Sequence, residues 1–540
     1  MVANQPIPSY ETPVNRAIRE TFMAQRALSV SRMTGNRSTF AQWYQAVVRE
    51  ADMAEPSPVR GAMVIKPWGF GTWEEMQRDL DRRIKETGHE NAYFPLFIPL
   101  SFIAKEAEHV EGFAKEMAVV THHRLKNIDG KLQPDPEAKL EEPYIVRPTS
   151  ETIIGDAFSR WIKSHRDLPV LINQWANVVR WELRPRLFLR TTEFLWQEGH
   201  TAHANEAEAV EETMKMLEVY RAFSEETLAV PVISGEKPEN ERFPGAVATY
   251  SIEAMMQDGK ALQAGTSHYL GQHFAEAQNI RFQNDAGELS FCHTTSWGLS
   301  TRMVGGVIMT HGDDDGLRLP PAIAPRQVVI VPMLRDKPED AAVLEFAESL
   351  ATALKAERAF DERLRVLVDK RATKSADKRW NWVRRGAPIL VEVGARDAAS
   401  GTVTFMRRDA LRDGDKIKSQ ALPRDEFVAI VPVLLAEIQA TLFKEAKARL
   451  DANIKTDIKT WDALAEYFGA AGEDDNDEFK GWVRAPWCKA SGAELDAIDA
   501  KLKTLKLTVR NAPADQPATF GPCIFTGRPG VEEVLIARAY

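Results

Sequence analysis

Apolar residues recur every three or four positions after Lys66, in PWGFGTWEEMQRDLDRRIKETGH, as they do on the buried face of an amphipathic helix. Gly88 marks the end of this predicted helix, and the NAYFPLFIPL that follows predicts a strand interrupted by prolines. Helical spacing also covers residues 39–50 and 204–227. The first part of the chain is therefore expected to combine helices with a proline-bearing strand.

Several strand-like runs follow within the first 300 residues, with helices between some of them. They are YIVRPTS, NVVRWEL, FLRTTEFLWQEG, ALQAGTSHYLG and LSFCHTTSWGLS. Strands that follow one another without regular crossover helices favour antiparallel pairing, so the runs predict a mixed, mainly antiparallel sheet.

A proline-rich stretch, RLPPAIAPRQ at residues 318–327, predicts a domain boundary. Strand-like and helical patterns alternate after it, which is typical of a smaller α/β domain. Residues 444–468 predict a connecting helix, and the acidic EDDNDE at 473–478 predicts a solvated loop. We expect an α+β protein with a lead-in at 1–60, an antiparallel sheet flanked by helices at 61–320, an α/β domain at 326–440 and a small α+β domain at 441–540.

The composition narrows the possible partners and the cellular location. A net charge of −9 gives the whole protein no attraction to DNA or to an anionic membrane, and no run of eighteen apolar residues predicts a membrane span. The three cysteines are widely spaced, which argues against a disulfide framework and suits a reducing compartment. The N-terminal residues lack the apolar core of a signal peptide, so we expect a cytoplasmic protein.

One strand-like run, FLRTTEFLWQEGH, mixes charged and aromatic residues on one face. The residues that would share this face are Arg190, Thr192, Phe194, Trp196, Glu198 and His200. A face turned to water does not explain Trp196, and a core face does not explain Glu198, whose burial without a partner is costly. A pocket with a carboxylate for an ammonium and a flat wall for an apolar body explains both, as in a small amino-acid site. A surface strand with chance alternation remains the alternative.

The arginines before this run point to a phosphate site. Arg180 and Glu182 would share a strand face in VVRWEL, where arginine can grip phosphate oxygens and the carboxylate can accept from an adenine amino group. The following RPRLFLR could form a loop over a polyphosphate or an exposed hairpin tip. No Gly-rich phosphate-binding motif is present, so ATP would be held by arginines on an antiparallel sheet.

Further polar residues recur near predicted strand ends. Thr149 and Glu151 stand in RPTSETI before a predicted helix, where such residues most often form a helix cap. LQAGTSHYLGQHF contributes Gln263, Thr266 and His268, and SWGLSTRMVGG contributes Arg302. Each is a weak signal alone.

Together, a proline-bearing strand after a helix, an Arg-x-Glu element and a late glycine-flanked arginine resemble the three motifs of class II aminoacyl-tRNA synthetases. The strings PVRGAMVIKPWGF, RPTSET, FLRTTEFLWQEGH, LQAGTSHYLGQHF and SWGLSTRMVGG resemble the prolyl-tRNA synthetase family of the eukaryote/archaeon-like type. The resemblance covers about residues 39–540. It implies a class II catalytic domain, an α/β anticodon-binding domain and a small C-terminal domain, with proline and ATP forming prolyl-adenylate before transfer to tRNA(Pro).

The resemblance also implies a role for each matching position. Catalytic roles fall to Arg180 and Arg302. The ATP-binding residues would be Arg180, Glu182, Arg190, Gln263, Thr266 and Arg302. The proline site would be formed by Thr149, Glu151, Arg180, Trp196, Glu198, His200, Phe243 and His268. Mg²⁺ would accompany ATP.

The family further implies a homodimer, built around the strand that contains Pro95, and a C-terminal residue, Tyr540, that folds back toward the catalytic domain. Relatives often hold zinc with four cysteines in the last domain, whereas this chain has only Cys488 and Cys523 there, so we expect no structural zinc. Residues 369–385 hold seven basic residues against two acids, with Trp380 and Trp382 between them. They predict either an RNA-binding surface or a solvated helix with core tryptophans.

Three other functions are weighed against this one. Threonyl-tRNA synthetase requires an active-site cysteine that the region 180–200 lacks. An amino-acid-activating or regulatory paralogue would not need an anticodon-like domain and the full set of arginines. A non-enzymatic RNA-binding protein would have no need of an amino-acid pocket.

Overall fold

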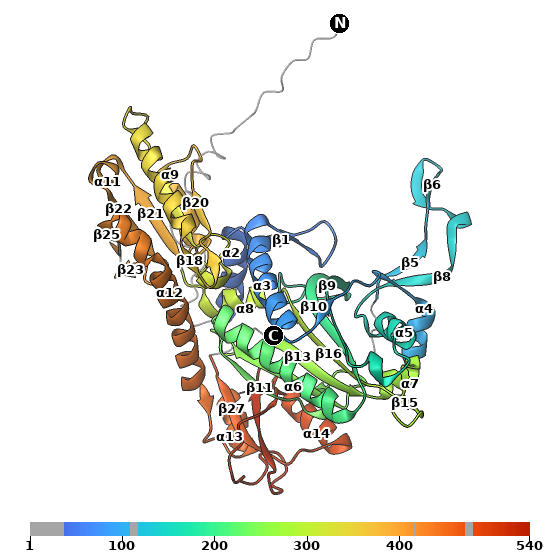
Figure 1. Cartoon of the computed structure of the whole chain (residues 1–540). Coiled ribbons are helices and arrows are strands. Elements are labelled where there is room, and N and C mark those ends of the chain that lie inside the picture. The colour runs from blue at the N-terminus through green and yellow to red at the C-terminus, as the bar shows by residue number, and fades with distance from the viewer. Residues whose placement is uncertain (1–36, 108–116, 415, 470–478) are drawn as a thin grey trace.

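The computed structural model describes residues 37–107, 117–414, 416–469 and 479–540. The first 36 residues of the predicted lead-in and the acidic stretch at 473–478 lie outside the described residues. The described residues form a large first domain, a second α/β domain and a third α+β domain (Figure 1). The predicted class, α+β with an antiparallel main sheet, is confirmed.

Two N-terminal helices pack beside the main sheet. They are α2 (Arg37–Glu50) and α3 (Pro67–Glu86), joined through the short hairpin of β1 (Ala54–Pro56) and β2 (Met63–Ile65). Helix α3 begins with Pro67 in its first turn and turns Trp68, Trp73, Leu80 and Ile84 inward at helical spacing. The prediction of a helix between Lys66 and Gly88 is therefore confirmed.

The main sheet has eight strands in the order β29-β11-β12-β13-β16-β10-β9-β3. Their bounds are β3 Glu90–Asn91, β9 Val170–Val179, β10 Glu193–His203, β11 Val232–Glu236, β12 Ala248–Met255, β13 Ala261–Gly271, β16 His293–Ser300 and β29 Ala512–Pro513. All neighbours pair antiparallel except β3 with β9. Helices α6 (Glu206–Ala222, extended by a π turn at Phe223–Thr227) and α8 (Arg302–His311) cover one face.

Smaller elements flank this sheet. Strands β4 (Phe97–Pro99), β8 (Lys139–Val146) and β5 (Val119–His122) form a three-stranded sheet, from which β6 (Leu125–Ile128) and β7 (Lys131–Pro134) project as a hairpin (Figure 1). Helices α4 (Leu100–Ala107), α5 (Glu151–Trp161) and α7 (His273–Gln278) lie beside it, together with the hairpin of β14 (Arg281–Gln283) and β15 (Leu289–Phe291). The strand predicted in NAYFPLFIPL is interrupted, as expected, and its two parts pair in different sheets with Pro95 between them. Prolines lack the N–H that a ladder needs, and the segment splits into β3, an irregular turn and β4.

The second domain has a five-stranded sheet in the order β20-β17-β21-β22-β25, parallel at its first three strands. These strands are β17 Val328–Pro332, β20 Val366–Val368, β21 Ile389–Val393, β22 Thr402–Arg407 and β25 Gln420–Pro423. Its helices are α9 Asp340–Ala356, α10 Ser375–Arg384, α11 Ala395–Ser400 and α12 Arg424–Ala452. Short hairpins complete it, with β18 Arg358–Ala359 against β19 Glu362–Arg363 and β23 Arg412–Asp413 against β24 Lys416–Ile417.

Helix α12 runs without a break through residue 440 and ends at Ala452, so the predicted connecting helix at 444–468 is wrong as one element. The chain instead forms β26 (Ile454–Lys455) and a separate helix α13 (Trp461–Phe468). By length and composition alone α12 could cross a membrane, with a mean hydropathy of 1.7 in its most apolar window. One such helix is weak evidence, because Phe427, Leu435 and Leu442 of α12 pack in the core of the second domain.

The third domain contributes to the main sheet. Its own sheet has the order β26-β27-β30-β28, with β27 Trp482–Trp487, β28 Thr508–Val509 and β30 Glu532–Ala537, covered by α13 and α14 (Gly492–Lys503). The strand that follows β28 in the chain, β29, does not join that sheet. It pairs with β11 at the edge of the main sheet. Tyr540 ends beside β13, where its N–H donates to the carbonyl of Ala261 and its hydroxyl donates to Asp258. The chain end thus folds back onto the first domain.

Candidate active site

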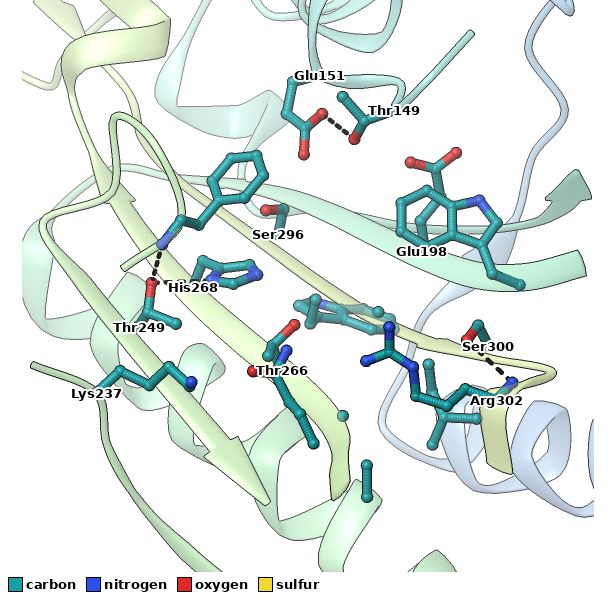
Figure 2. A pocket seen from close by; sticks show the side chains of 18 of the residues that line it. Thr149, Glu151, Glu198, Lys237, Thr249, Thr266, His268, Ser296, Ser300 and Arg302 are labelled. Carbon is teal, nitrogen blue, oxygen red and sulfur yellow. Dashed lines mark hydrogen bonds between the residues drawn. The ribbon is translucent and has the colours of Figure 1, made fainter. Parts of the chain in front are cut away.

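A cavity of about 230 Å³ opens on the main sheet. Strands β10, β13 and β16 supply its floor, the turn before α5 supplies one wall, and the segment 237–243 after β11 supplies another. Alternate residues of β10, from Phe194 to His200, line the cavity as expected for a strand, whereas runs of consecutive residues of β13 and β16 line it. Figure 2 shows Thr149 and Glu151 on one side and Arg302 with Ser300 at another end.

Most of the predicted site residues come together here. Those lining the cavity are Thr149, Glu151, Arg180, Trp196, Glu198, His200, Phe243, Gln263, Thr266, His268 and Arg302. Glu182 and Arg190 do not line it. Strand β9 ends at Val179, and the chain forms a loop before β10 begins at Glu193. The prediction that Arg180 and Glu182 share a strand face is therefore wrong, as is the extension of the β10 face back to Arg190.

The loop between β9 and β10 carries both Arg180, which lines the cavity, and Arg190, which lies outside it but acts on Arg302 through its charge. The Arg180 N–H donates to the carbonyl of Thr192 at 2.8 Å, and its side-chain Nε donates to the carbonyl of Pro148 at 2.8 Å. Arg190 is exposed at the loop, where its backbone pairs with Arg186. Its positive charge helps to lower the pKa of Arg302, after burial. The predicted roles of Glu182 and Arg190 toward ATP stay predictions.

Glu198 is the centre of a buried hydrogen-bond network. Its carboxylate accepts from Ser150 Oγ at 2.5 Å and from Gln174 Nε2 at 2.8 Å, and its other oxygen lies 3.0 Å from Nε2 of His200. Burial alone would raise the pKa of Glu198, but the bonds from His200, Ser150 and Gln174 together hold it below its usual value. The same carboxylate raises the pKa of His200 against the opposing effect of burial. Both shifts favour the ionised pair, a carboxylate beside an imidazolium.

The wall opposite the floor carries a second carboxylate and a cation–π contact. Glu151 is buried at the start of α5 and accepts a short hydrogen bond from Thr149. The guanidinium of Arg180 lies 5.3 Å from the ring centroid of Trp196 and 5.6 Å from that of Phe194. A Cβ on Gly298 would come within 3.3 Å of the Trp196 ring, so glycine makes room for the indole. An aromatic wall between a carboxylate and an arginine suits a small zwitterion.

His268 is a neutral residue of the cavity. Its Nδ1 lies 3.0 Å from Thr249 Oγ1, which in turn accepts from the backbone N–H of Phe243 at 2.9 Å. The ring of Phe243 packs on the imidazole with 4.8 Å between centroids. Burial, and then the cations His200, Lys237 and Arg180, lower the pKa of His268 to about 3. The histidine therefore provides hydrogen bonds and shape without charge.

Arg302 begins α8 at the opposite end of the cavity (Figure 2). Its backbone N–H donates to Ser300 Oγ at 3.2 Å, and its Nε donates to the carbonyl of Leu189 at 3.2 Å. Burial and the neighbouring arginines lower its pKa to about 10, so the guanidinium stays charged near neutral pH. Gln263 and Thr266 of β13 line the same cavity. A half-buried arginine with polar neighbours is suited to an anion such as a phosphate.

Sequence reasoning missed several residues of the cavity. One missed group is the segment after β11, which contributes Lys237, Glu241 and Arg242. The small residues Ser296, Gly298 and Ser300 also line it, on alternate positions of β16. That alternation is visible in TTSWGLS and could have been found. The residues after β11 carry no pattern, because the fold alone brings them to the cavity.

The comparisons with known proteins agree with this geometry. Residues 135–311 match the family described as tRNA synthetase class II core domain (G, H, P, S and T), and residues 327–434 match the family described as anticodon binding domain. The chain is 62% identical over 519 residues to the proline–tRNA ligase of Sphingomonas elodea, covering 96% of this chain and 100% of the relative. The chain belongs to the prolyl-tRNA synthetases.

Two further prolyl-tRNA synthetases match 96% of this chain. The proline–tRNA ligase of Sphingopyxis alaskensis is 62% identical over 520 residues, which are 96% of each protein. The crystal structure of the prolyl-tRNA synthetase of Cryptosporidium parvum complexed with L-proline and AMP superposes with a TM-score of 0.82. The two chains are 34% identical, and the match covers 96% of this chain and 98% of that one.

In this synthetase the basic stretch 369–385 is largely structural. Trp380 and Trp382 are only 8% and 5% exposed and belong to the core shared with the catalytic domain. The Trp382 indole N–H donates to Asp369 at 2.8 Å, and the Arg385 guanidinium lies 4.9 Å from the Trp382 ring centroid. The core interpretation of these tryptophans is therefore the correct one, and they do not offer free stacking surfaces to RNA.

The two cysteines of the third domain lie close together in this synthetase. Cys488 Sγ accepts from Arg528 Nη2 at 3.3 Å and from Thr526 Oγ1 at 3.5 Å, and the Cys523 thiol contacts Cys488. Within the described ranges, no group of three or more His, Cys, Asp and Glu side chains is placed to hold a metal ion. A structural zinc site needs four ligands, and the two cysteines supply only two. The absence of zinc stays a prediction.

Proposed function

We propose that this protein attaches L-proline to tRNA(Pro) in two steps, as a proline–tRNA ligase. The observation that carries the proposal is one cavity with two chemically different ends, lined also by Arg180. One end has Trp196 and the carboxylates Glu151 and Glu198, and the other has Arg302 among polar residues. The relatives that share this chain's full length are proline–tRNA ligases.

In the first step, an oxygen of the proline carboxylate attacks the α-phosphorus of ATP. A P–O bond forms, the bond to the leaving pyrophosphate breaks, and prolyl-adenylate remains. Arg180 lines the cavity beside Trp196, and its charge also acts on Arg302, so its guanidinium would contact both the proline carboxylate and the α-phosphate. Arg302 would bind the distal phosphates. Both arginines are already fixed by backbone carbonyls, so they need little reorganisation as negative charge develops.

The proline end recognises a secondary ammonium beside an apolar ring. Trp196 gives the ring a flat wall, and Phe243 with His268 gives it a second one. Glu198 is already paired with the cation of His200. Glu151 accepts a hydrogen bond from the neutral hydroxyl of Thr149, so its negative charge can bind the proline ammonium. The ammonium would share Glu198 with His200 and bind Glu151 with Thr149.

In the second step, a ribose hydroxyl of the terminal adenosine of tRNA attacks the carbonyl carbon of the adenylate, and AMP leaves. Positioning and electrostatics are sufficient for this transfer, without a covalent enzyme intermediate. The second domain, which belongs to the anticodon-binding family, would recognise the distant end of the same tRNA.

Mg²⁺ is proposed to enter with ATP. The described residues offer no preformed cluster of metal ligands. Mg²⁺ commonly keeps several waters and binds through phosphate oxygens and one or two carboxylates, which fits such a site. The ion would share the charge of the triphosphate with Arg302.

A homodimer and a cytoplasmic location are also proposed. Exposed apolar side chains gather near β4, where Tyr93 is 72% exposed and Phe97 is 45% exposed, with Tyr144 of β8 stacked on Phe97. Exposed apolar groups of this size are typical of a protein interface. The cytoplasmic location rests on the few, widely spaced cysteines.

The function is tested by exchange of pyrophosphate into ATP, measured with purified protein and each of the twenty amino acids. We expect exchange with proline, and weak exchange with alanine or cysteine. Exchange with threonine alone would overturn the specificity. Silence with all amino acids would indicate a paralogue that has kept the fold and lost the reaction.

A further inference from the structure

A buried lysine lines the cavity without a role in the reaction as described above. Lys237 follows β11, and its side chain is 2% exposed. Its Nζ lies 3.5 Å from a carboxylate oxygen of Glu241 and 3.9 Å from Oε1 of Glu253. Figure 2 shows its amino group turned toward the residues that line the cavity. Both acids pair with the ammonium at 3.5 Å or more, and its three N–H groups keep capacity for a further partner at the cavity wall.

Glu253 connects this lysine to the third domain. Its carboxylate is fully buried in β12 and accepts from Ser251 Oγ at 2.9 Å. Its Oε2 accepts from Arg510 at 3.1 Å from Nε and at 2.9 Å from Nη2. Arg510 is itself buried, and its Nη1 donates to Thr508 Oγ1 at 2.9 Å. A chain of alternating charge therefore runs from Arg510 through Glu253 to Lys237.

Backbone pairing also connects the third domain to the segment that carries Lys237. Strand β29 of the third domain pairs with the last residues of β11, Gly235 and Glu236, immediately before Lys237. A Cβ on Gly235 would lie 2.2 Å from the carbonyl oxygen of Ala512, so this approach requires glycine. Asn511 adds a bond from its side-chain amide to the carbonyl of Ile233 at 3.0 Å. The third domain thus holds the strand end from which Lys237 extends.

We propose that Arg510 is a positioning residue for adenylate formation, which acts through Glu253 to keep the ammonium of Lys237 at the cavity wall. There the ammonium faces the anionic oxygens of the carboxylate and phosphates of the substrates. Without Arg510, the carboxylate of Glu253 would lose the partner that fixes its position, and Lys237 would lose its fixed anionic anchor at the cavity wall. The inference rests on the proposed function, since it assigns the third domain a part in that reaction.

The test compares Arg510→Met, Arg510→Lys and the double variant Arg510→Met/Glu253→Gln with the unchanged full-length protein. The matched control is Arg484→Met, because Arg484 binds Glu533 and Asp515 within the third domain and does not line the cavity. Each protein is assayed for proline-dependent pyrophosphate exchange, for ATP affinity by calorimetry and for Tm. Exchange by the unchanged protein tests the proposed function itself. The ATP affinity measures the contribution of Lys237 to binding and does not depend on catalysis.

We expect Arg510→Met to lower kcat/KM in the exchange by about tenfold or more and to weaken ATP binding, because a small misplacement of a charged group is costly. Arg510→Lys should recover part of the loss, and Arg484→Met should stay close to the unchanged protein. The double variant removes the unpaired buried carboxylate, so its Tm should recover while its exchange and ATP affinity stay low. Two results would show that the third domain only stabilises the fold. One is recovery of exchange together with Tm in the double variant. The other is a lowered Tm with unchanged exchange and ATP affinity in Arg510→Met.

Discussion

Nε2 of His200 lies 3.0 Å from Oε2 of Glu198, and both side chains are buried in the floor of the cavity. Their pKa values move apart, since that of His200 is raised and that of Glu198 is lowered. A proline ammonium that approaches Glu198 must therefore compete with an imidazolium. The two cations share one carboxylate, so proton loss from His200 and proline binding are linked.

The first prediction concerns this linkage. The stabilisation that His200 gains from Glu198 is present below its ordinary pKa of 6.5 and is lost as pH rises through its raised value in the folded protein. Across that rise we expect the KM for proline to fall by at most about tenfold per pH unit, since one proton is released. The measurement is KM for proline in pyrophosphate exchange from pH 6 upward. His200→Gln should flatten the profile, and an unchanged slope in that variant would contradict the linkage.

The second prediction assigns the largest effect on ATP to Arg302. Arg302 is half-buried at the end of the cavity away from Glu151, and replacing it with alanine removes a fixed positive charge from the distal phosphates. We expect Arg302→Ala to lower kcat in the exchange by about 10²–10³, as for a preorganised donor to developing charge. Arg396→Ala, on the exposed face of α11, serves as the control and should leave kcat unchanged. A loss confined to the KM for proline would place Arg302 at the wrong end of the site.

The sequence predicted the strands and the site to different degrees, for physical reasons. The alternation in FLWQEGH was sufficient to place Trp196, Glu198 and His200 on one face, because the period of a strand is fixed by its geometry. The same argument failed at Arg190, where the strand had not yet begun. Lys237 was out of reach, since the pairing of β11 with β29, far away in sequence, determines where it lies. Local patterns do not encode such distant pairings.

The third prediction tests the proposed dimer at β4. Phe97 and Tyr144 stack with 6.2 Å between ring centroids on an exposed surface. We expect Phe97→Glu to weaken self-association by about tenfold or more, as when an aromatic anchor of an interface is lost. Light scattering after size exclusion, over a range of concentrations, measures the change. Leu132→Glu on the projecting hairpin is the control, because Leu132 is also exposed, at 70%, but lies away from β4. A monomeric unchanged protein would contradict the proposed dimer.

The fourth prediction concerns metal in the third domain. Cys488 and Cys523 provide two sulfur ligands, and Arg528 places a positive charge against Cys488, which disfavours a bound cation. We expect less than one zinc per chain by elemental analysis, with Tm unchanged after treatment with a chelator. Cys488→Ser should then leave proline-dependent exchange intact. Stoichiometric zinc that is lost together with Tm on chelation would show that other ligands complete a site.

The last prediction separates packing from RNA recognition at Trp382. This indole donates to Asp369, lies against the Arg385 guanidinium and meets the Trp68 ring edge-on at 5.4 Å between centroids. Replacing it with alanine should cost about 3–5 kcal/mol of unfolding free energy, as for other buried tryptophans. Trp382→Phe keeps part of the packing and should lower Tm while leaving the KM for tRNA unchanged in aminoacylation. Lys374→Ala, at an exposed position before α10, is the control for Tm. If Trp382→Phe instead keeps Tm and raises only the KM for tRNA, the indole contacts RNA and the core assignment is wrong.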